Sequence, residues 1–132
     1  MRRSVIIVDT SVWIDYFRGS NTALASTLDG LLDEDRVVLV PPVRLELLLG
    51  CRKSQRVRLL RLLEAIPTLP ATEGAWKAAE RLSLELREDG VTAGVVDLLI
   101  AALAFEHAAS LWTLDKDFDP LFKTQRLEAF LF

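Results

Sequence analysis

The chain has 132 residues, 51% of them hydrophobic, so it is long enough to fold as one domain around a sizeable core. Sixteen Lys and Arg against nineteen Asp and Glu give a net charge of −3, which argues against nucleic-acid binding through a generally basic surface. The chain has one cysteine, which excludes an internal disulfide framework. Because it also has only one histidine, a zinc site is not expected.

The chain shows no sign of a membrane segment or a secretion signal. No apolar run approaches the roughly 18 residues that a membrane-spanning helix needs. The basic start Met1-Arg2-Arg3 is followed by an apolar stretch that Asp9 interrupts, with no small-residue cleavage site after it. We therefore expect one domain over residues 1–132, located in the cytoplasm and not associated with a membrane.

Short apolar segments alternate with helical patterns along the chain, which predicts an α/β fold with a mostly parallel sheet and helices on its faces. In chain order, the expected strands are residues 5–8, 36–40, 67–70 (very short), 110–113 and 127–132 (an edge strand). The first expected helix follows residues 9–11, and the later helices cover residues 22–33, 42–51, 54–65, a stretch from 72 to before Gly90, and 95–107.

A carboxylate ends the first expected strand. Val5-Ile6-Ile7-Val8 is typical of a strand buried on both faces, and Asp9-Thr10-Ser11 follows it directly. Asp9 therefore lies at the carboxyl edge of the sheet, where open α/β folds bind their ligands. The alternative is that one of these three residues only caps the next helix.

Three further acids occupy positions of the same kind. Glu46 lies in a helix that is apolar on most sides, where an ionised carboxylate is disfavoured without a compensating cation. A pairing with Arg44 or Arg52, or a helix rolled so that Glu46 reaches water, would also explain it. Asp97 opens a helix, which the helix dipole favours by itself. Asp115 follows the strand at residues 110–113.

The run Asp115-x-Asp117-x-Asp119 raises the possibility of a calcium loop of the EF-hand type. Such a loop needs glycine at its sixth position and glutamate at its twelfth. Those positions hold Pro120 and Arg126, so the EF-hand interpretation fails.

If the four acids converge at one sheet edge, several carboxylates share a small space, which implies bound cations or strongly raised pKa values. Only oxygen ligands are available there, which favours Mg²⁺ or Mn²⁺ over zinc. A cluster of four also leaves the rest of the chain slightly basic. Candidate RNA-binding residues lie along one helical hairpin, although a solvated helix face explains them as well: Arg44, Arg52, Lys53 and Arg56.

The order and spacing of these motifs resemble the PIN domain, and most closely the VapC-type ribonuclease toxins. The resemblance runs from Val5 to about Phe118. It rests on Asp9-Thr10-Ser11 after an apolar strand, Glu46 with Gly50, Asp97-x-x-Ile100-Ala101-Ala102, and Thr113-x-Asp115-x-Asp117-Phe118. It implies a three-layer α/β/α fold whose central sheet has four or five strands.

The resemblance also implies a site. The acids matching its metal ligands are Asp9, Glu46, Asp97 and Asp115, with Asp117 matching an acid of some members. Thr10 and Thr113 match hydroxyl positions that orient the site, and Ser11 is expected beside them. Many members carry Ser or Thr before the glutamate, whereas this chain has Pro41 and Val43.

The function implied is a Mg²⁺- or Mn²⁺-dependent endoribonuclease that acts as the toxin of a toxin–antitoxin pair. A homodimer and a cognate antitoxin are expected partners. The alternatives are a non-catalytic interaction module of the same fold and a metal-dependent nuclease that cuts single-stranded DNA. A receiver-like phosphotransfer domain is disfavoured because it needs an adjacent acidic pair on its first strand, where this chain has Ile7-Val8.

Overall fold

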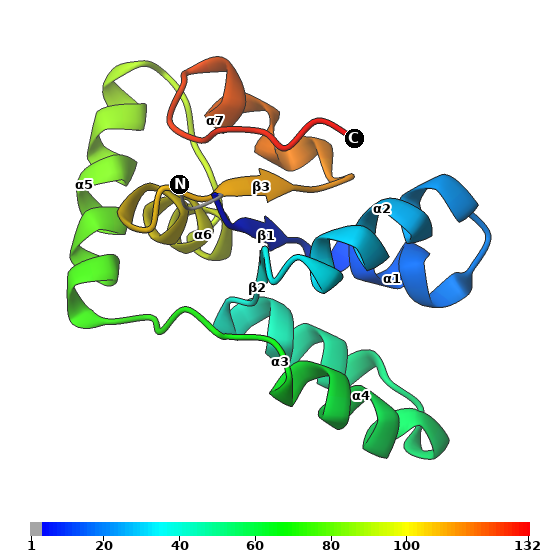
Figure 1. Ribbon diagram of the computed structural model, residues 1–132. Coiled ribbons are helices and arrows are strands. Elements are labelled where there is room, and N and C mark those ends of the chain that lie inside the picture. Colours follow the sequence, from blue (N-terminus) through cyan, green and yellow to red (C-terminus); the bar gives the residue numbers. More distant parts are fainter. Residues whose placement is uncertain (1–3) are drawn as a thin grey trace.

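A three-stranded parallel sheet lies at the centre of the molecule (Figure 1). The computed structural model describes residues 4–132; the basic start at residues 1–3 lies outside them. The strands are β1 (Ile6–Val8), β2 (Val37–Val38) and β3 (Ser110–Trp112), in the order β2-β1-β3. All three residues of β1 are buried, because strands pair on both sides of it and helices cover its faces.

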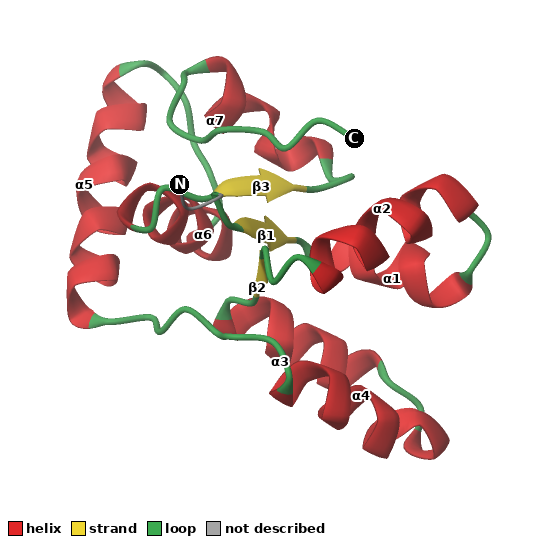
Figure 2. Ribbon diagram, viewed as in Figure 1, coloured by secondary structure: helices red, strands yellow, loops and turns green. Residues whose placement is uncertain are grey.

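Helices flank this sheet, as the alternating sequence pattern predicts (Figure 2). They are α1 (Thr10–Arg18), α2 (Thr22–Asp33), α3 (Pro41–Gly50), α4 (Arg56–Glu64), α5 (Glu73–Glu88), α6 (Val95–Glu106) and α7 (Asp119–Lys123), with 3₁₀ turns η1 (Lys53–Gln55) and η2 (Lys116–Phe118). Within residues 4–132, none of them has the length and apolar character that crossing a membrane requires.

The prediction of four or five strands was wrong. The expected strands at residues 67–70 and 127–132 are each reduced to one isolated parallel bridge, Leu39 to Thr68 and Leu111 to Ala129. Pro67 and Pro70 have no N–H to donate, so a longer ladder cannot form at the first bridge. At the second, the chain is held by aromatic packing, with the rings of Phe130 and Phe132 against Trp112.

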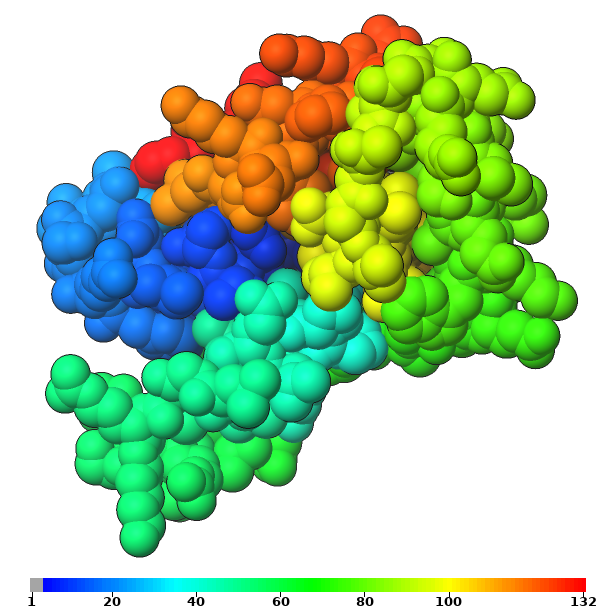
Figure 3. Space-filling model, turned by 180° about the vertical axis from the view of Figure 1, so that it is seen from behind, coloured from blue at the N-terminus to red at the C-terminus, as the bar shows by residue number. Residues whose placement is uncertain are grey.

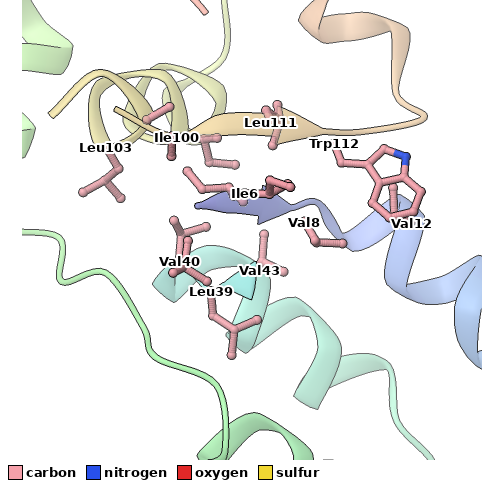
Figure 4. Close-up of a cluster of buried hydrophobic side chains, with 14 of the residues drawn as sticks. Ile6, Val8, Val12, Leu39, Val40, Val43, Ile100, Leu103, Leu111 and Trp112 are labelled. Carbon is pink, nitrogen blue, oxygen red and sulfur yellow. The ribbon is translucent and has the colours of Figure 1, made fainter. Parts of the chain in front are cut away.

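The core surrounds β1. Ile6 and Val8 lie between Ile100 and Leu103 of α6 on one side and Leu39, Val40 and Val43 on the other (Figure 4). Each of these side chains is at most 1% exposed. Burying one such aliphatic side chain stabilises the fold by about 1.5–3 kcal/mol, so the position of β1 is firmly fixed. Asp9, which directly follows β1, is therefore held in a fixed position as well.

Local signals set the helix ends. The Asn21 side chain accepts a hydrogen bond from the N–H of Leu24 at the start of α2, and Thr72 accepts one from Ala75 at the start of α5. Gly19, with φ of 70°, ends α1 in the left-handed conformation. The helix expected over residues 54–65 instead begins with the 3₁₀ turn η1 and continues as α4.

Two pairs of helices project from the carboxyl edge of the sheet. The arrows of β1 and β3 point toward α1 and α2, and the α3–α4 hairpin extends on the same side (Figure 1). α1 contacts α2 and α3, and α3 contacts α4. Residues at the ends of β1 and β3 therefore lie beside the space between these helices.

Candidate metal centre and adjoining groove

Asp9 lies at the end of β1 and is buried, with 8% of its surface exposed. Its backbone occupies the N-cap position of α1, but its side chain makes no capping hydrogen bond, so the capping alternative for Asp9 was wrong. Its Oδ2 atom instead accepts a bond from Ser11 Oγ at 2.9 Å and another from Thr113 Oγ1 at 2.7 Å.

The backbone after β3 fixes both hydroxyl groups. The N–H of Leu114 donates to Ser11 Oγ and that of Asp115 donates to Thr113 Oγ1, each at 3.0 Å. Because each hydroxyl oxygen accepts an N–H, its own proton is directed to Asp9 Oδ2. Within residues 4–132 no hydrogen bond reaches Asp9 Oδ1, which leaves that oxygen available as a ligand.

The three hydroxyl residues that were predicted to support the site make different contacts in the structure. Ser11 and Thr113 contact Asp9, whereas Thr10 does not. Thr10 Oγ1 is buried and has no hydrogen-bond partner among the described residues. The contact between Ser11 and Thr113 joins positions about a hundred residues apart, and chain order gave no signal for it.

Asp97 lies in the first turn of α6, and its pKa reflects burial and electrostatic repulsion from the other expected acids. The pKa of its carboxyl is raised from 3.8 to about 6, first by burial and then by the negative charges of other carboxylates. In decreasing order of effect these are Asp115, Asp9, Asp117 and Glu46. All four acids predicted as ligands, together with Asp117, therefore belong to one electrostatic cluster at the carboxyl edge of the sheet.

Glu46 is exposed, which corrects the expectation that it lies in apolar surroundings. α3 is rolled so that Val43 and Leu47 face the core, and Glu46 reaches water beside the cluster. Asp115 and Asp117 follow β3 and are also exposed, and Asp115 Oδ1 accepts a bond from the N–H of Asp117 at 2.9 Å.

The cluster suits a hard divalent cation by its chemistry. Its donors are all carboxylate oxygens, and the partners of the buried Asp9 carboxylate are neutral hydroxyls. As the side chains lie, no three His, Cys, Asp or Glu groups in the described chain are close enough to hold an ion. Glu46, Asp115 and Asp117 are exposed and form no ion pair with residues 4–132, so a cation can draw them together.

A groove of about 850 Å³ runs from this cluster between α1 and the α3–α4 hairpin. It is visible in Figure 3 as the hollow between the blue α1 region and the green α3–α4 region. We call it the helix groove. Its lining residues are Thr10, Ile14, Phe17, Arg18, Glu46, Leu47, Gly50, Cys51, Arg52, Gln55, Arg58, Leu59 and Leu62.

The basic residues predicted to contact RNA lie at different positions relative to the helix groove. Arg52 lines the helix groove, whereas Lys53 and Arg56 are exposed beside it. Arg44 Nη1 donates to the carbonyl oxygen of Leu63 at 3.1 Å, so Arg44 joins α3 to the end of α4.

Arg18 also lines the groove, and the sequence reasoning missed it. A signal was available. Thr10, Ile14, Phe17 and Arg18 recur at spacings of three and four, which places them on one face of a helix.

Comparison with known proteins gives matches over almost the whole chain. The PIN domain pattern matches residues 6–121. The VapC ribonuclease Mb1587 of Mycobacterium bovis is 32% identical over 130 residues, covering 95% of this chain and 97% of that protein. The VapBC-5 structure from Mycobacterium tuberculosis superposes with a TM-score of 0.67 at 28% identity, covering 98% of this chain and 100% of that one. The promoter-DNA-bound VapBC2 structure from Rickettsia felis gives a TM-score of 0.77 at 21% identity, covering 96% and 97%.

Proposed function

The chain belongs to the PIN domain family, and on that premise we propose that it is a metal-dependent endoribonuclease acting as the toxin of a toxin–antitoxin pair. The metal we propose is Mg²⁺, for which Mn²⁺ can substitute. The observation that carries this proposal is the buried Asp9 carboxylate at the end of β1, which Ser11 and Thr113 hold beside the other acids of the cluster. A cluster of this kind is costly without a cation, and oxygen ligands favour Mg²⁺ or Mn²⁺.

We assign the roles within the site as follows. Asp9, Asp97 and Asp115 hold the cation, with Asp117 as a further acid at the exposed side. Ser11 and Thr113 hold Asp9 Oδ2, which leaves Oδ1 available to bind the cation. Glu46 is either a ligand or the base that accepts the proton of the attacking water. When bound, the cation lowers the pKa of that water and stabilises the leaving oxygen of the phosphodiester.

The proposed protein partner is a cognate antitoxin, and we also propose a homodimer. The antitoxin is supported by two structural neighbours, one described as a member of the VapBC family of toxin-antitoxin systems and the other as a toxin-antitoxin complex from Klebsiella pneumoniae. A short reading frame immediately upstream of this gene would encode the expected antitoxin; co-expression with its product should give a stable complex on size exclusion, and RNA cleavage by that complex should be suppressed. Light scattering on the purified chain then measures its oligomeric state.

An RNA cleavage assay tests the proposal. We expect the purified chain to cut RNA in Mg²⁺ or Mn²⁺ and to stop in EDTA. Asp9→Asn and Asp97→Asn should each abolish cleavage while the far-ultraviolet circular dichroism stays unchanged. The matched control is Glu80→Gln, an exposed acid of α5 outside the cluster, which should cut at the wild-type rate.

The same assay separates the alternatives. Cleavage of single-stranded DNA in preference to transfer or ribosomal RNA would identify a DNA nuclease. Absence of cleavage on all of these substrates, in either metal and without antitoxin, would identify a non-catalytic module. If both Asn variants cut as fast as the wild type, the assigned residues are wrong.

A further inference from the structure

We propose that a second copy of this chain docks on the face formed by α5, α6 and the turn after α7, with Phe105 of each copy seated in a small pocket of the other. The pocket has a volume of about 230 Å³. Its apolar floor includes Leu82, Ala101 and Ala102, and its exposed lining residues include Arg81, Glu85 and Phe105. We call it the α5–α6 pocket. This inference does not depend on the ribonuclease function.

The α5–α6 pocket lies away from the acidic cluster. α6 begins at the carboxyl edge of the sheet, with Asp97 in its first turn, and Phe105 lies near its other end. At a rise of about 1.5 Å per residue, these two residues are about 12 Å apart along the helix axis. The arrows of β1 and β3 point away from α5 (Figure 1). A partner on this face therefore leaves the proposed metal centre open.

The volume of the pocket indicates that its occupant is a single side chain. Ligand pockets typically have volumes of about 300–1,000 Å³, so this space is too small for a cofactor or a nucleotide. The floor is buried and carries small methyl groups at Ala101 and Ala102, which leave room above them. One aromatic ring can lie on such a floor.

Phe105 is an aromatic side chain in the right position. Its ring is 86% exposed and contacts no other ring within residues 4–132. It lines the α5–α6 pocket without filling it. Covering an aromatic side chain removes about 150–250 Å² from water, which favours association. Because one patch carries both the ring and the space for it, a two-fold axis beside the pocket brings each ring to the floor of the other copy.

The charges beside the pocket match those of a second copy. Arg81 and Glu85 are one turn apart on the exposed side of α5, with Ser83 midway between them. In an antiparallel pair of α5 helices with the two-fold axis at the level of Ser83, Arg81 of each copy faces Glu85 of the other. Arg81 forms no ion pair with residues 4–132. Symmetry therefore creates two ion pairs from a charge that has no partner within the described chain.

The turn after α7 holds one wall of the pocket in place. Arg126 donates to Glu85 Oε2 at 2.7 Å and to Asp89 Oδ2 at 3.1 Å, which leaves Glu85 Oε1 available to a second copy. Gln125 has φ of 60°, in the left-handed region that residues other than glycine rarely adopt. The N–H of Arg126 donates to the Leu121 carbonyl at 2.9 Å, which fixes this turn. A wall that is already ordered loses little conformational entropy when a side chain packs against it.

Sedimentation velocity tests the proposal, in EDTA so that no cation bridges two copies. Between about 5 and 500 µM we expect the weight-average mass of the wild type to double, a range that suits a small interface. Phe105→Ala should raise the dissociation constant about thirtyfold, as for aromatic side chains at the centre of interfaces. Phe17→Ala, which removes an exposed ring of α1, should associate like the wild type. Because the readout is a doubling, it applies to a monomer and to a chain already paired through another face.

Charge reversal identifies the contact. Arg81→Glu and Glu85→Arg should each weaken self-association about tenfold, because like charges then face one another. Mixing the two variants in equal amounts should restore the wild-type dissociation constant, because every acid in the mixed pair then faces an arginine. Thermal unfolding checks that Glu85→Arg, which loses its bond to Arg126, is folded. If it is not, Phe105→Ala and Arg81→Glu still decide the question, because both positions are exposed.

Three results would overturn the proposal. They are a constant wild-type mass over the whole range, an association that Phe105→Ala and Arg81→Glu leave unchanged, and folded reversal variants whose mixture associates no better than either alone. Phe105→Ala should cut RNA at the wild-type rate, because it lies outside the acidic cluster. A chain that associates through this face and cuts no RNA would refute only the ribonuclease function, whereas one that cuts RNA at constant mass would refute only this interface.

Discussion

At the residue scale, the hydroxyl pair on Asp9 decides how the site is arranged. Ser11 follows β1 and Thr113 follows β3, and both donate to the same carboxylate oxygen. The N–H groups of Leu114 and Asp115 donate to these hydroxyls in turn. The pair therefore orients Asp9 and also fixes the start of the loop that carries Asp115.

Thr113 offers a direct test of this arrangement. Thr113→Val keeps the shape of the side chain but removes the bond to Asp9 Oδ2 and the acceptor for the Asp115 N–H. We expect the Mg²⁺ concentration at half-maximal cleavage to rise by about 10–100-fold, as for other partners of metal ligands. Thr113→Ser keeps the hydroxyl and should retain most of the wild-type metal affinity. A Thr113→Val variant that keeps the wild-type Mg²⁺ requirement, beside a Thr113→Ser variant that loses it, would show that the methyl packing, and not the hydroxyl, matters.

Asp97 yields a prediction about stability. Its folded-state pKa of about 6 lies above its ordinary value of 3.8, so its ionisation opposes folding. This contribution to stability falls as the pH rises from about 4 to 6, and it stays reduced above that. In EDTA at neutral pH, Asp97→Asn should therefore raise the free energy of unfolding by about 1 kcal/mol, a figure discounted for solvent screening of a partly exposed group. Urea unfolding measures it, with Glu80→Gln as control, and the gain should vanish below about pH 4. A lower free energy of unfolding in Asp97→Asn would contradict the inference that the ionised Asp97 carboxylate is destabilised by burial and neighbouring charges.

At the element scale, α1 and α2 form one arm of the helix groove. Tyr16 of α1 donates a hydrogen bond of 2.5 Å to Asp29 Oδ1 of α2. The stack of Trp13 on Phe17 lies in the same helix, so the position of α1 sets the apolar wall of the groove. The α3–α4 arm has an equivalent link in the bond from Arg44 to the Leu63 carbonyl.

The α1–α2 link predicts a shifted tyrosine titration. The hydrogen bond to Asp29, followed by burial and the charges of Asp29 and Asp33, raises the pKa of Tyr16 from 10.0 to about 12. Tyr16 is the only tyrosine, so tyrosinate absorbance reports it alone. At about pH 11 we expect little ionisation in the wild type and substantial ionisation in Asp29→Ala, with circular dichroism confirming that both are folded. The hydrogen bond from Tyr16 to Asp29 stabilises the fold below pH 10, and this contribution is lost as the pH rises toward 12. Equal titration curves would rule out the link.

At the scale of the whole molecule, charge is unevenly distributed. Acids gather at the carboxyl edge of the sheet, and basic side chains lie along α4 and the groove, within a net charge of −3. The acidic cluster costs free energy in the metal-free fold, as the raised pKa of Asp97 indicates. A cation that binds only the folded chain offsets that cost.

Divalent cations should therefore stabilise the protein. At a Mg²⁺ concentration about a hundredfold above Kd, linkage adds about 2.7 kcal/mol to the free energy of unfolding. Differential scanning fluorimetry should show the unfolding midpoint rising with Mg²⁺ or Mn²⁺ in the wild type and not in Asp9→Asn. The same ionic strength of NaCl serves as control. A rise that NaCl reproduces, or that persists in Asp9→Asn, would mean that no specific cation binds at this cluster.

The sequence alone determined the local features of this protein. The bounds of α2 agree with the predicted helix at residues 22–33, and β1, β2 and β3 lie within the predicted strand segments. Asp9 was placed correctly at a strand end because a buried apolar run and its terminating acid are adjacent in the chain. The family was also recognisable from the order and spacing of the sequence motifs, and the PIN domain pattern matches residues 6–121.

Only the tertiary structure decided the features that depend on distant contacts. Two expected edge strands became single bridges, because proline lacks a donor and aromatic rings hold the other segment. The roll of α3 exposed Glu46, and the fold selected Ser11 and Thr113, instead of Thr10, as the partners of Asp9. The helix groove exists only because two helical arms stand apart at one edge of the sheet. Periodicity is encoded within a few residues, whereas helix roll, strand pairing and grooves result from packing between segments far apart in the chain.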